Sequence, residues 1–139
     1  MKSFQLEIVS PEEEIFSGRA QKLFVTGIMG ELEILYGHAP LLTSLAPGPV
    51  WIVGDDGQED GLVIFGGMLE VQPDTTIVLA DTALRAKDID EAAANAAKRT
   101  TEHAIASKEQ GLDYAKAHID LTFARAQLRI VRKIQSLRK

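Results

Sequence analysis

The chain has 139 residues, of which 45% are hydrophobic and 25% charged, with a formal net charge of −5. This ordinary mixture excludes global disorder and predicts one folded domain, or one domain with a small appendage. The absence of cysteine excludes disulfides and thiolate chemistry. No apolar run approaches the ~18 residues of a membrane-spanning helix, and the acidic start of the chain lacks the apolar core of a signal peptide.

Short apolar runs separated by turn residues predict β-strands in the first part of the chain. They are expected at residues 4–8, 23–26, 31–34, 50–53, 62–65, 68–71 and 76–79. Gly54-Asp55-Asp56-Gly57 is a strong hairpin signal, and Gly66-Gly67 marks a bend or a bulge. Turn signals at roughly every 8–12 residues are typical of a sandwich or a barrel.

The composition then changes to that of two helices. Residues 88–106 include seven alanines and no valine or proline, which favours a helix with a thin face. Asp88 and Glu91 have capping-box spacing and predict the start of this helix. Gly111 is the expected break between the helices, and Asp113 is the expected N-cap of the second one.

The second helix is expected to continue almost to the C-terminus and to have two stripes. Its apolar side chains follow 4-3-4-3 spacing and are widened by larger neighbours: Ala117, Leu121, Phe123, Ala124, Leu128, Ile130, Val131, Ile134 and Leu137. The basic stripe consists of Arg125, Arg129, Arg132 and Lys133, with Arg138 and Lys139 at the end. A solvated helix face is the plain interpretation, but such a helix can also dock on an apolar surface while it presents positive charge.

The charge is divided unevenly between these two parts. Through Leu84 there are three basic and 13 acidic residues, whereas the part from Arg85 onward has 12 basic and seven acidic ones. Such halves predict two modules with different partners, which we assign to residues 1–84 and 85–139. The acidic first half argues against a nucleic-acid partner.

Two long motifs resemble the epsilon subunit of the rotary F-type ATP synthase. They are GIMGELEILYGHAPLLTSLAPG, from Gly27 to Gly48, and FGGMLEVQPDTTIVLADTA, from Phe65 to Ala83. The order of β segments and helices also agrees, over essentially the whole chain. The family usually has glycine in place of Glu33 and proline in place of Tyr36, which bears on the shape of one loop. The resemblance implies an α+β fold, with a flattened N-terminal β-sandwich followed by an antiparallel two-helix hairpin.

The same resemblance implies a non-catalytic central-stalk subunit that couples the catalytic head to the membrane ring during proton-driven ATP synthesis. The implied partners are the gamma subunit, the membrane c-ring and the catalytic alpha and beta subunits. The implied location is peripheral, on the cytoplasmic face of the bacterial inner membrane.

Each implied contact can be assigned to residues of this sequence. The loop that includes Gly30, Glu31, Glu33 and His38 is expected to contact the c-ring. The basic stripe is expected to face an acidic loop of the beta subunits, where extended helices would inhibit ATP hydrolysis.

An ATP-sensing module is the alternative interpretation. Some epsilon subunits bind ATP without hydrolysing it, through Ile or Leu, Asp, two variable residues and then Arg-Ala. Here Ile89, Asp90 and Ala94 match, but Ala93 replaces the arginine and cannot donate to a phosphate. Arg99 lies six positions further on and on another face, so any binding is expected to be weak.

Other kinds of chemistry have little support in the sequence. His38, His103 and His118 do not have the spacing of metal ligands, so we expect no metal site. The sequence has neither the GxxxxGK[ST] phosphate loop nor a GxSxG nucleophile motif, so we expect no cofactor and no catalytic activity of its own.

Overall fold

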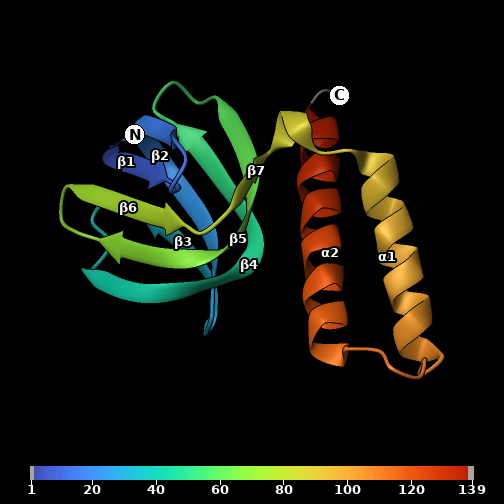
Figure 1. Ribbon diagram of the computed structural model, residues 1–139. Coiled ribbons are helices and arrows are strands. Elements are labelled where there is room, and N and C mark those ends of the chain that lie inside the picture. Colours follow the sequence, from blue (N-terminus) through green and yellow to red (C-terminus); the bar gives the residue numbers. More distant parts are fainter. Residues whose placement is uncertain (1, 138–139) are drawn as a thin grey trace.

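The computed structural model describes residues 2–137 and contains a β-domain followed by two antiparallel helices (Figure 1). This confirms the predicted α+β fold. The elements are β1 (Phe4–Val9), β2 (Glu14–Gly27), β3 (Gly30–Leu35), β4 (Leu41–Gly54), β5 (Glu59–Val71), β6 (Thr75–Ala80), β7 (Ala83–Arg85), the 3₁₀ turn η1 (Ala86–Asp88), α1 (Glu91–Ala106) and α2 (Tyr114–Leu137).

The strands form one seven-stranded sheet that closes on itself. Hydrogen-bonded neighbours follow the order β1-β6-β5-β4-β2-β3, and β1 also pairs with β2. β1 is parallel to β6 and antiparallel to β2, so the first strand completes the ring. Alternate side chains of the strands point inward and form the core, which includes the fully buried Leu6, Ile8, Leu23, Val25, Leu69 and Val78.

The predicted bend at Gly66-Gly67 lies within one long strand, β5, rather than between two strands. The two glycines have φ values of +111° and +145°, which residues with a Cβ atom rarely adopt. Ile64 and Leu69 both enter the core although they are five residues apart, so the inward face of the strand changes at the glycines. A Cβ on Gly67 would overlap the carbonyl oxygen of Leu79, and this position therefore requires glycine.

The first helix begins later than the sequence predicts. Asp88 lies in η1, and the N-cap is Asp90, whose carboxylate accepts a hydrogen bond of 3.1 Å from the N–H of Ala93. The predicted cap at Asp88 is wrong because Ile89 and Asp90 both have extended backbone conformations. A capping residue must directly precede the first helical residue. Asp113, by contrast, caps α2 as predicted, through a 3.1 Å hydrogen bond from the N–H of Lys116.

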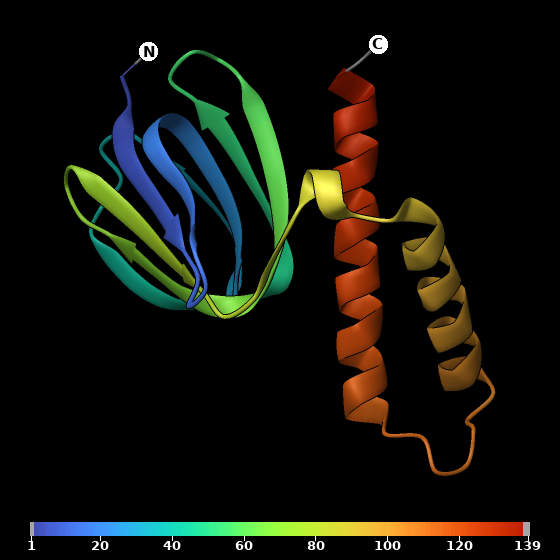
Figure 2. The same ribbon diagram turned by 45° about the horizontal axis from the view of Figure 1, so that its top comes forward.

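The two helices lie on one side of the β-domain. Both views show α2 between the strands and α1, so that α1 forms the outer layer (Figures 1 and 2). α2 contacts β4 and β5, and α1 packs mainly on α2. The only residue of α1 that is buried within the described part of the chain is Ala94.

Candidate functional site

The candidate site is the interface between α2 and the outer face of β4 and β5. Trp51, Val63, Ala126 and Ile130 form a buried cluster there, which includes the single tryptophan of the chain. Partly buried apolar side chains surround it: Phe24, Val53, Ala86, Ile89, Phe123 and Ile134. The rings of Phe65 and Phe123 add an edge-to-face contact with centroids 5.2 Å apart.

The apolar stripe of α2 divides into two faces. With about 100° per residue, Phe123, Ala126, Ile130 and Ile134 lie on one side of the helix and contact the sheet cluster. The other buried residues lie on a second side, which faces α1: Ala117, Leu121, Ala124 and Leu128. The basic stripe lies on the ridge between these two faces.

Several side chains of the basic stripe contact other elements of the same chain. Arg125 pairs with Glu102 of α1, with 3.1 Å between Nη2 and Oε2. The Lys133 ammonium lies 4.5 Å from the ring centroid of Trp51. Arg132 is exposed and forms no ion pair within residues 2–137. Arg138 and Lys139 lie outside the described residues.

Arg129 is the residue of the stripe that reaches the predicted ring-contact loop. Its Nη1 lies 2.8 Å from Oε1 of Glu31, and its guanidinium group lies 5.1 Å from the ring centroid of Phe24. Both side chains of the ion pair are 54% exposed. Such pairs contribute about 0.2–1 kcal/mol, and therefore the buried apolar cluster must provide most of the docking energy.

Glu33 lies on the same face of β3 as Glu31, two residues further along. It pairs with Lys22 of the neighbouring strand at 2.8 Å. Glu33 also lines a cavity of about 130 Å³ together with Arg129 and Lys133. Two sets of residues that the sequence assigns to different partners, the acidic loop and the basic stripe, therefore meet at this interface.

The remaining members of the predicted loop lie at opposite ends of β3. Gly30 is the first residue of β3, directly after the β2–β3 turn, with a φ of +132° and open space where a Cβ would stand. His38 follows the other end of the strand, and its Nδ1 lies 2.7 Å from the carbonyl oxygen of Ala39. A six-residue strand spans about 20 Å, so these residues do not form one compact site.

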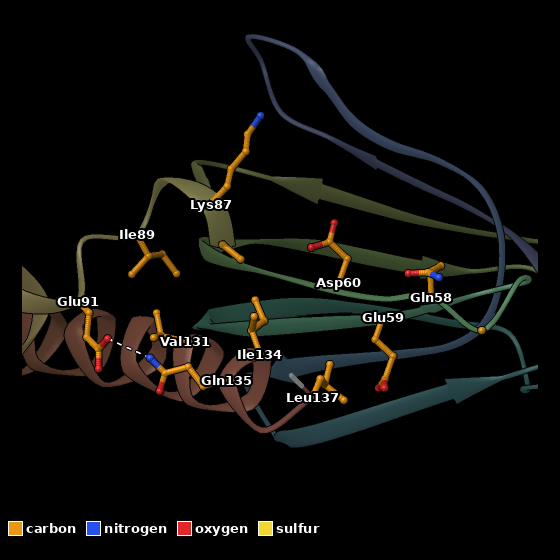
Figure 3. A pocket seen from close by; sticks show the side chains of 12 residues that line it. Gln58, Glu59, Asp60, Lys87, Ile89, Glu91, Val131, Ile134, Gln135 and Leu137 are labelled. Atoms are coloured by element: carbon orange, nitrogen blue, oxygen red, sulfur yellow. Dashed lines mark hydrogen bonds between the residues drawn. The ribbon is translucent and has the colours of Figure 1, made fainter. Parts of the chain in front are cut away.

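The predicted nucleotide-binding residues are not brought together. Asp90 uses its carboxylate as a helix cap, and Arg99 is exposed on α1, roughly 14 Å further along the helix axis. Ile89 packs against the sheet cluster and lines a cleft of about 760 Å³ beside the end of α2 (Figure 3).

The charge of this cleft is unfavourable for a nucleotide. Glu59, Asp60 and Glu91 line it, and Lys87 is the only base among its lining residues in the described part of the chain. Three carboxylates against one ammonium group would repel a triphosphate. The cleft therefore gives the ATP-sensing interpretation no support.

Two further features concern residues 2–137, the part of the chain that the structure describes. No group of three or more His, Cys, Asp or Glu side chains in this part is arranged to hold a metal ion. None of its helices is long and apolar enough to cross a membrane.

Comparisons with known proteins match both parts of the chain. Residues 3–86 match the family model described as the beta-sandwich domain of the ATP synthase delta/epsilon chain, and residues 87–132 match its long alpha-helix domain. The chain is 50% identical over 135 residues to the ATP synthase epsilon chain of Chromohalobacter salexigens, covering 97% of this chain and 96% of that protein.

The chain belongs to the ATP synthase delta/epsilon chain family. This finding confirms the resemblance to the epsilon subunit of the F-type ATP synthase. Solved structures of the same family of complexes agree in fold.

One similar structure is a chain of the Euglena gracilis mitochondrial ATP synthase, with a TM-score of 0.69 and 19% identity, covering 99% of this chain and 82% of that one. Another is from the central stalk and c-ring structure of the Tetrahymena thermophila mitochondrial ATP synthase, with a TM-score of 0.56, 17% identity and 96% coverage of both chains. Likeness at these identities shows a shared fold.

The sheet side of the interface is not predicted by the sequence of this ATP synthase epsilon-type chain. The pattern around Trp51 predicts a strand but does not indicate that its side chain points outward against α2. Its indole N–H donates a 2.8 Å hydrogen bond to Glu59. One signal was available, because Trp51 and Val53 alternate with the buried Val50 and Ile52 and form an apolar outer face. No local signal indicated Glu102 or Lys22 as partners of the charged residues.

Proposed function

We propose that this chain is a non-catalytic subunit of the central stalk of an F-type ATP synthase. In this role it couples the catalytic head to the membrane ring, and its helical hairpin inhibits ATP hydrolysis. We further propose that it is peripheral, on the cytoplasmic face of a bacterial inner membrane. The observation that carries the regulatory part is the basic stripe, because two of its exposed side chains, Arg129 and Lys133, contact the β-domain and become available when α2 leaves it.

An apolar face of the β-domain is the surface that we propose for the gamma subunit. Leu42, Met68 and Leu79 lie on neighbouring strands with their side chains on the outside of the barrel. Leu42 is 67% exposed and Leu79 is 49% exposed. Exposed apolar patches of this kind are typical of interfaces in permanent complexes.

The acidic residues of β3 are the surface that we propose for the ring. Glu31 and Glu33 extend from one face of the strand next to the β2–β3 turn. They present two negative charges to a partner with basic loops. Ile28 and Met29 at the tip of the turn are 62% and 92% exposed and can add apolar contacts.

The hairpin is the part that we propose as the brake. It docks through one apolar cluster centred on Trp51, whereas hydrogen-bonded strands hold the β-domain together. Release of α2 from the β-domain would free Arg129 and Lys133, and separation of the two helices would also free Arg125, to meet an acidic loop of the beta subunits. Attraction between such charges is reversible and depends on salt concentration.

The brake is tested by the ATPase rate of a catalytic head that lacks its epsilon subunit. We expect the full chain to slow hydrolysis, and a chain that ends at Ala86 to bind without slowing it. A variant with Arg125→Ala, Arg129→Ala and Arg132→Ala should bind normally and inhibit weakly. Inhibition that survives this triple substitution would contradict the role of the stripe and leave the coupling role intact.

The proposed gamma surface is tested by Leu42→Glu. Because Leu42 is mostly exposed, we expect an unchanged unfolding transition but at least tenfold weaker binding to purified gamma subunit. Glu12→Gln, on an exposed turn elsewhere in the β-domain, is the control and should bind like the unaltered chain. Equal binding by Leu42→Glu would remove this face from the proposal.

A further inference from the structure

Glu31 lies at the point where two proposed contact surfaces meet. It follows the β2–β3 turn directly, opposite Thr26 in the register of β2 and β3. Its carboxylate accepts the 2.8 Å hydrogen bond from Arg129 of α2. Among residues 2–137, this is the only ion pair between the hairpin and the strands β1–β6.

We propose that α2 and the membrane ring compete for Glu31. This inference rests on the proposed function, in which Glu31 meets basic residues of the ring. A carboxylate bonded to Arg129 offers less negative charge to a second cation, and engagement by the ring withdraws it from Arg129. Ring docking and hairpin docking therefore oppose each other.

The competition changes the affinity for the ring and the affinity for α2 by the same factor. If docked α2 lowers the affinity of the β-domain for the ring by some factor, the ring lowers the affinity of α2 for the β-domain by the same factor. Both side chains of the pair are 54% exposed, so solvent screens their attraction. We expect a factor of about two to five, which biases the hairpin without fixing its position.

Glu33 also belongs to the proposed ring surface, but unlike Glu31 it forms no ion pair with α2 among the described residues. Its partner, Lys22, belongs to β2 of the same domain and stays beside it wherever the helices are. A change at Glu33 therefore alters the charge of the proposed ring surface and leaves the ion pair between Arg129 and Glu31 in place. Arg125 gives the matching control on the helix, because it pairs with Glu102 of α1 and not with the β-domain.

The experiment measures hairpin position and ring binding on the same full-length protein. The chain has no cysteine, so spin labels can be attached at Glu12→Cys and Thr100→Cys, two exposed positions in the β1–β2 turn and in α1. Distances between the labels give the fraction of molecules with an undocked hairpin. Binding is titrated with the c-ring and gamma subcomplex of the same ATP synthase.

Two substitutions should have the same effect on the hairpin and opposite effects on binding. Arg129→Gln should increase the undocked fraction and tighten binding to the ring–gamma subcomplex by about two- to fivefold. Glu31→Gln should also increase the undocked fraction but weaken binding. Adding the subcomplex to the unaltered chain should increase its ratio of undocked to docked molecules by the same factor.

The charge swap Glu31→Arg with Arg129→Glu provides a second test. It should restore the docked hairpin, because the pair is re-formed with opposite polarity, and it should bind the ring worse than the unaltered chain. Arg125→Gln should leave ring binding unchanged. Glu33→Gln keeps the pair of Arg129 with Glu31 and should change the undocked fraction less than Glu31→Gln does.

The outcomes separate this inference from the proposed function. If Arg129→Gln leaves either the undocked fraction or the ring affinity unchanged, the competition is overturned while the rotor role stands. If Glu31→Gln binds the subcomplex as tightly as the unaltered chain, Glu31 does not contact the ring, and the proposed competition for Glu31 is overturned as well. If the unaltered chain does not bind the subcomplex, the proposed function itself fails.

Discussion

The β-domain buries large branched side chains, whereas the first helix of the hairpin buries alanine. Leu6, Ile8, Leu23 and Leu69 are completely inaccessible to solvent inside a ring of paired strands. α1 buries Ala94, and its neighbouring alanines Ala92, Ala93, Ala96 and Ala97 are exposed or partly exposed. The burial of apolar side chains therefore stabilises the β-domain, whereas the hairpin is attached to that domain through a single apolar cluster at Trp51.

This difference indicates a division of labour. A domain whose core lies inside a closed sheet keeps its shape when the helices leave, because few core residues come from the hairpin. One apolar cluster joins the hairpin to the β-domain, so its docked and undocked arrangements can differ by only a few kcal/mol. The chain thus combines a stable β-domain with a helical hairpin that is easily displaced.

The largest expected effect is on the stability of the β-domain. Leu69→Ala removes a fully buried side chain from the β-domain and should lower the free energy of unfolding by about 2–5 kcal/mol, because it leaves a cavity. Urea denaturation followed by circular dichroism measures the loss. Leu42→Ala makes the same chemical change at a position that is 67% exposed, and we expect a loss within about 0.5 kcal/mol. Similar losses for the two variants would contradict the assigned core.

A smaller effect should separate the two regions. Ile130→Ala truncates a side chain that is 1% exposed between α2 and the sheet, and should weaken docking of the hairpin by about 2 kcal/mol or more. Release of α2 exposes Trp51, the single tryptophan, so its fluorescence emission should move to longer wavelength. Hydrogen exchange of the β1 and β5 amides should stay slow.

Ile119→Ala is the matched control for this variant. Ile119 also belongs to α2 but is 41% exposed, so its truncation should leave the tryptophan emission unchanged. Faster exchange across the strands in Ile130→Ala would show that the β-domain needs the hairpin, and would contradict the independence of the two regions.

The smallest effect concerns the hairpin alone. Asp90→Ala removes the carboxylate that caps α1 and should cost about 1 kcal/mol of helix stability. Faster hydrogen exchange at Ala93 and Ala94 measures the fraying. Asp90→Asn keeps an oxygen acceptor and should exchange almost as slowly as the unaltered chain. An unchanged exchange rate in Asp90→Ala would show that neighbouring contacts, rather than the cap, fix this end of α1.

Local patterns in the sequence predicted which elements form but underestimated the length of the strands. The alternation of residues 4–8 and 31–34 predicted β1 and β3 almost to their ends. β2 is much longer than residues 23–26, because Ser17 and Gly18, which resemble a break, pair with β1. The register of one strand against another depends on tertiary packing and is not visible in a local window.

The prolines of β4 illustrate the same limit. Pro47 and Pro49 indicate the end of a strand by local rules, because proline lacks an N–H group. They lie inside β4, at the point where its pairing with β2 is interrupted between Leu45 and Trp51. No hydrogen bond to β2 is needed there, and so the strand continues through both residues.

The sequence predicted the charged residues of the candidate site but not their arrangement. Spacing along a helix indicated the basic stripe, and the resemblance indicated Glu31. The contact between Arg129 and Glu31 joins residues 98 positions apart, and helical or strand periodicity contains no information about such a pair. The predicted cap at Asp88 is wrong for a local reason, since the extended backbone of Ile89 places the cap at Asp90 instead.

The position of α2 between α1 and the sheet has a consequence for synthesis of the protein. Ribosomes make the β-domain first, then α1, and last the helix on which α1 packs. A nascent chain therefore carries an alanine-rich helix without its support until nearly all residues have been added. Because Ile134 belongs to the cluster on the sheet, loss of the last turns of α2 would weaken the attachment of both helices and leave the core of the β-domain unchanged.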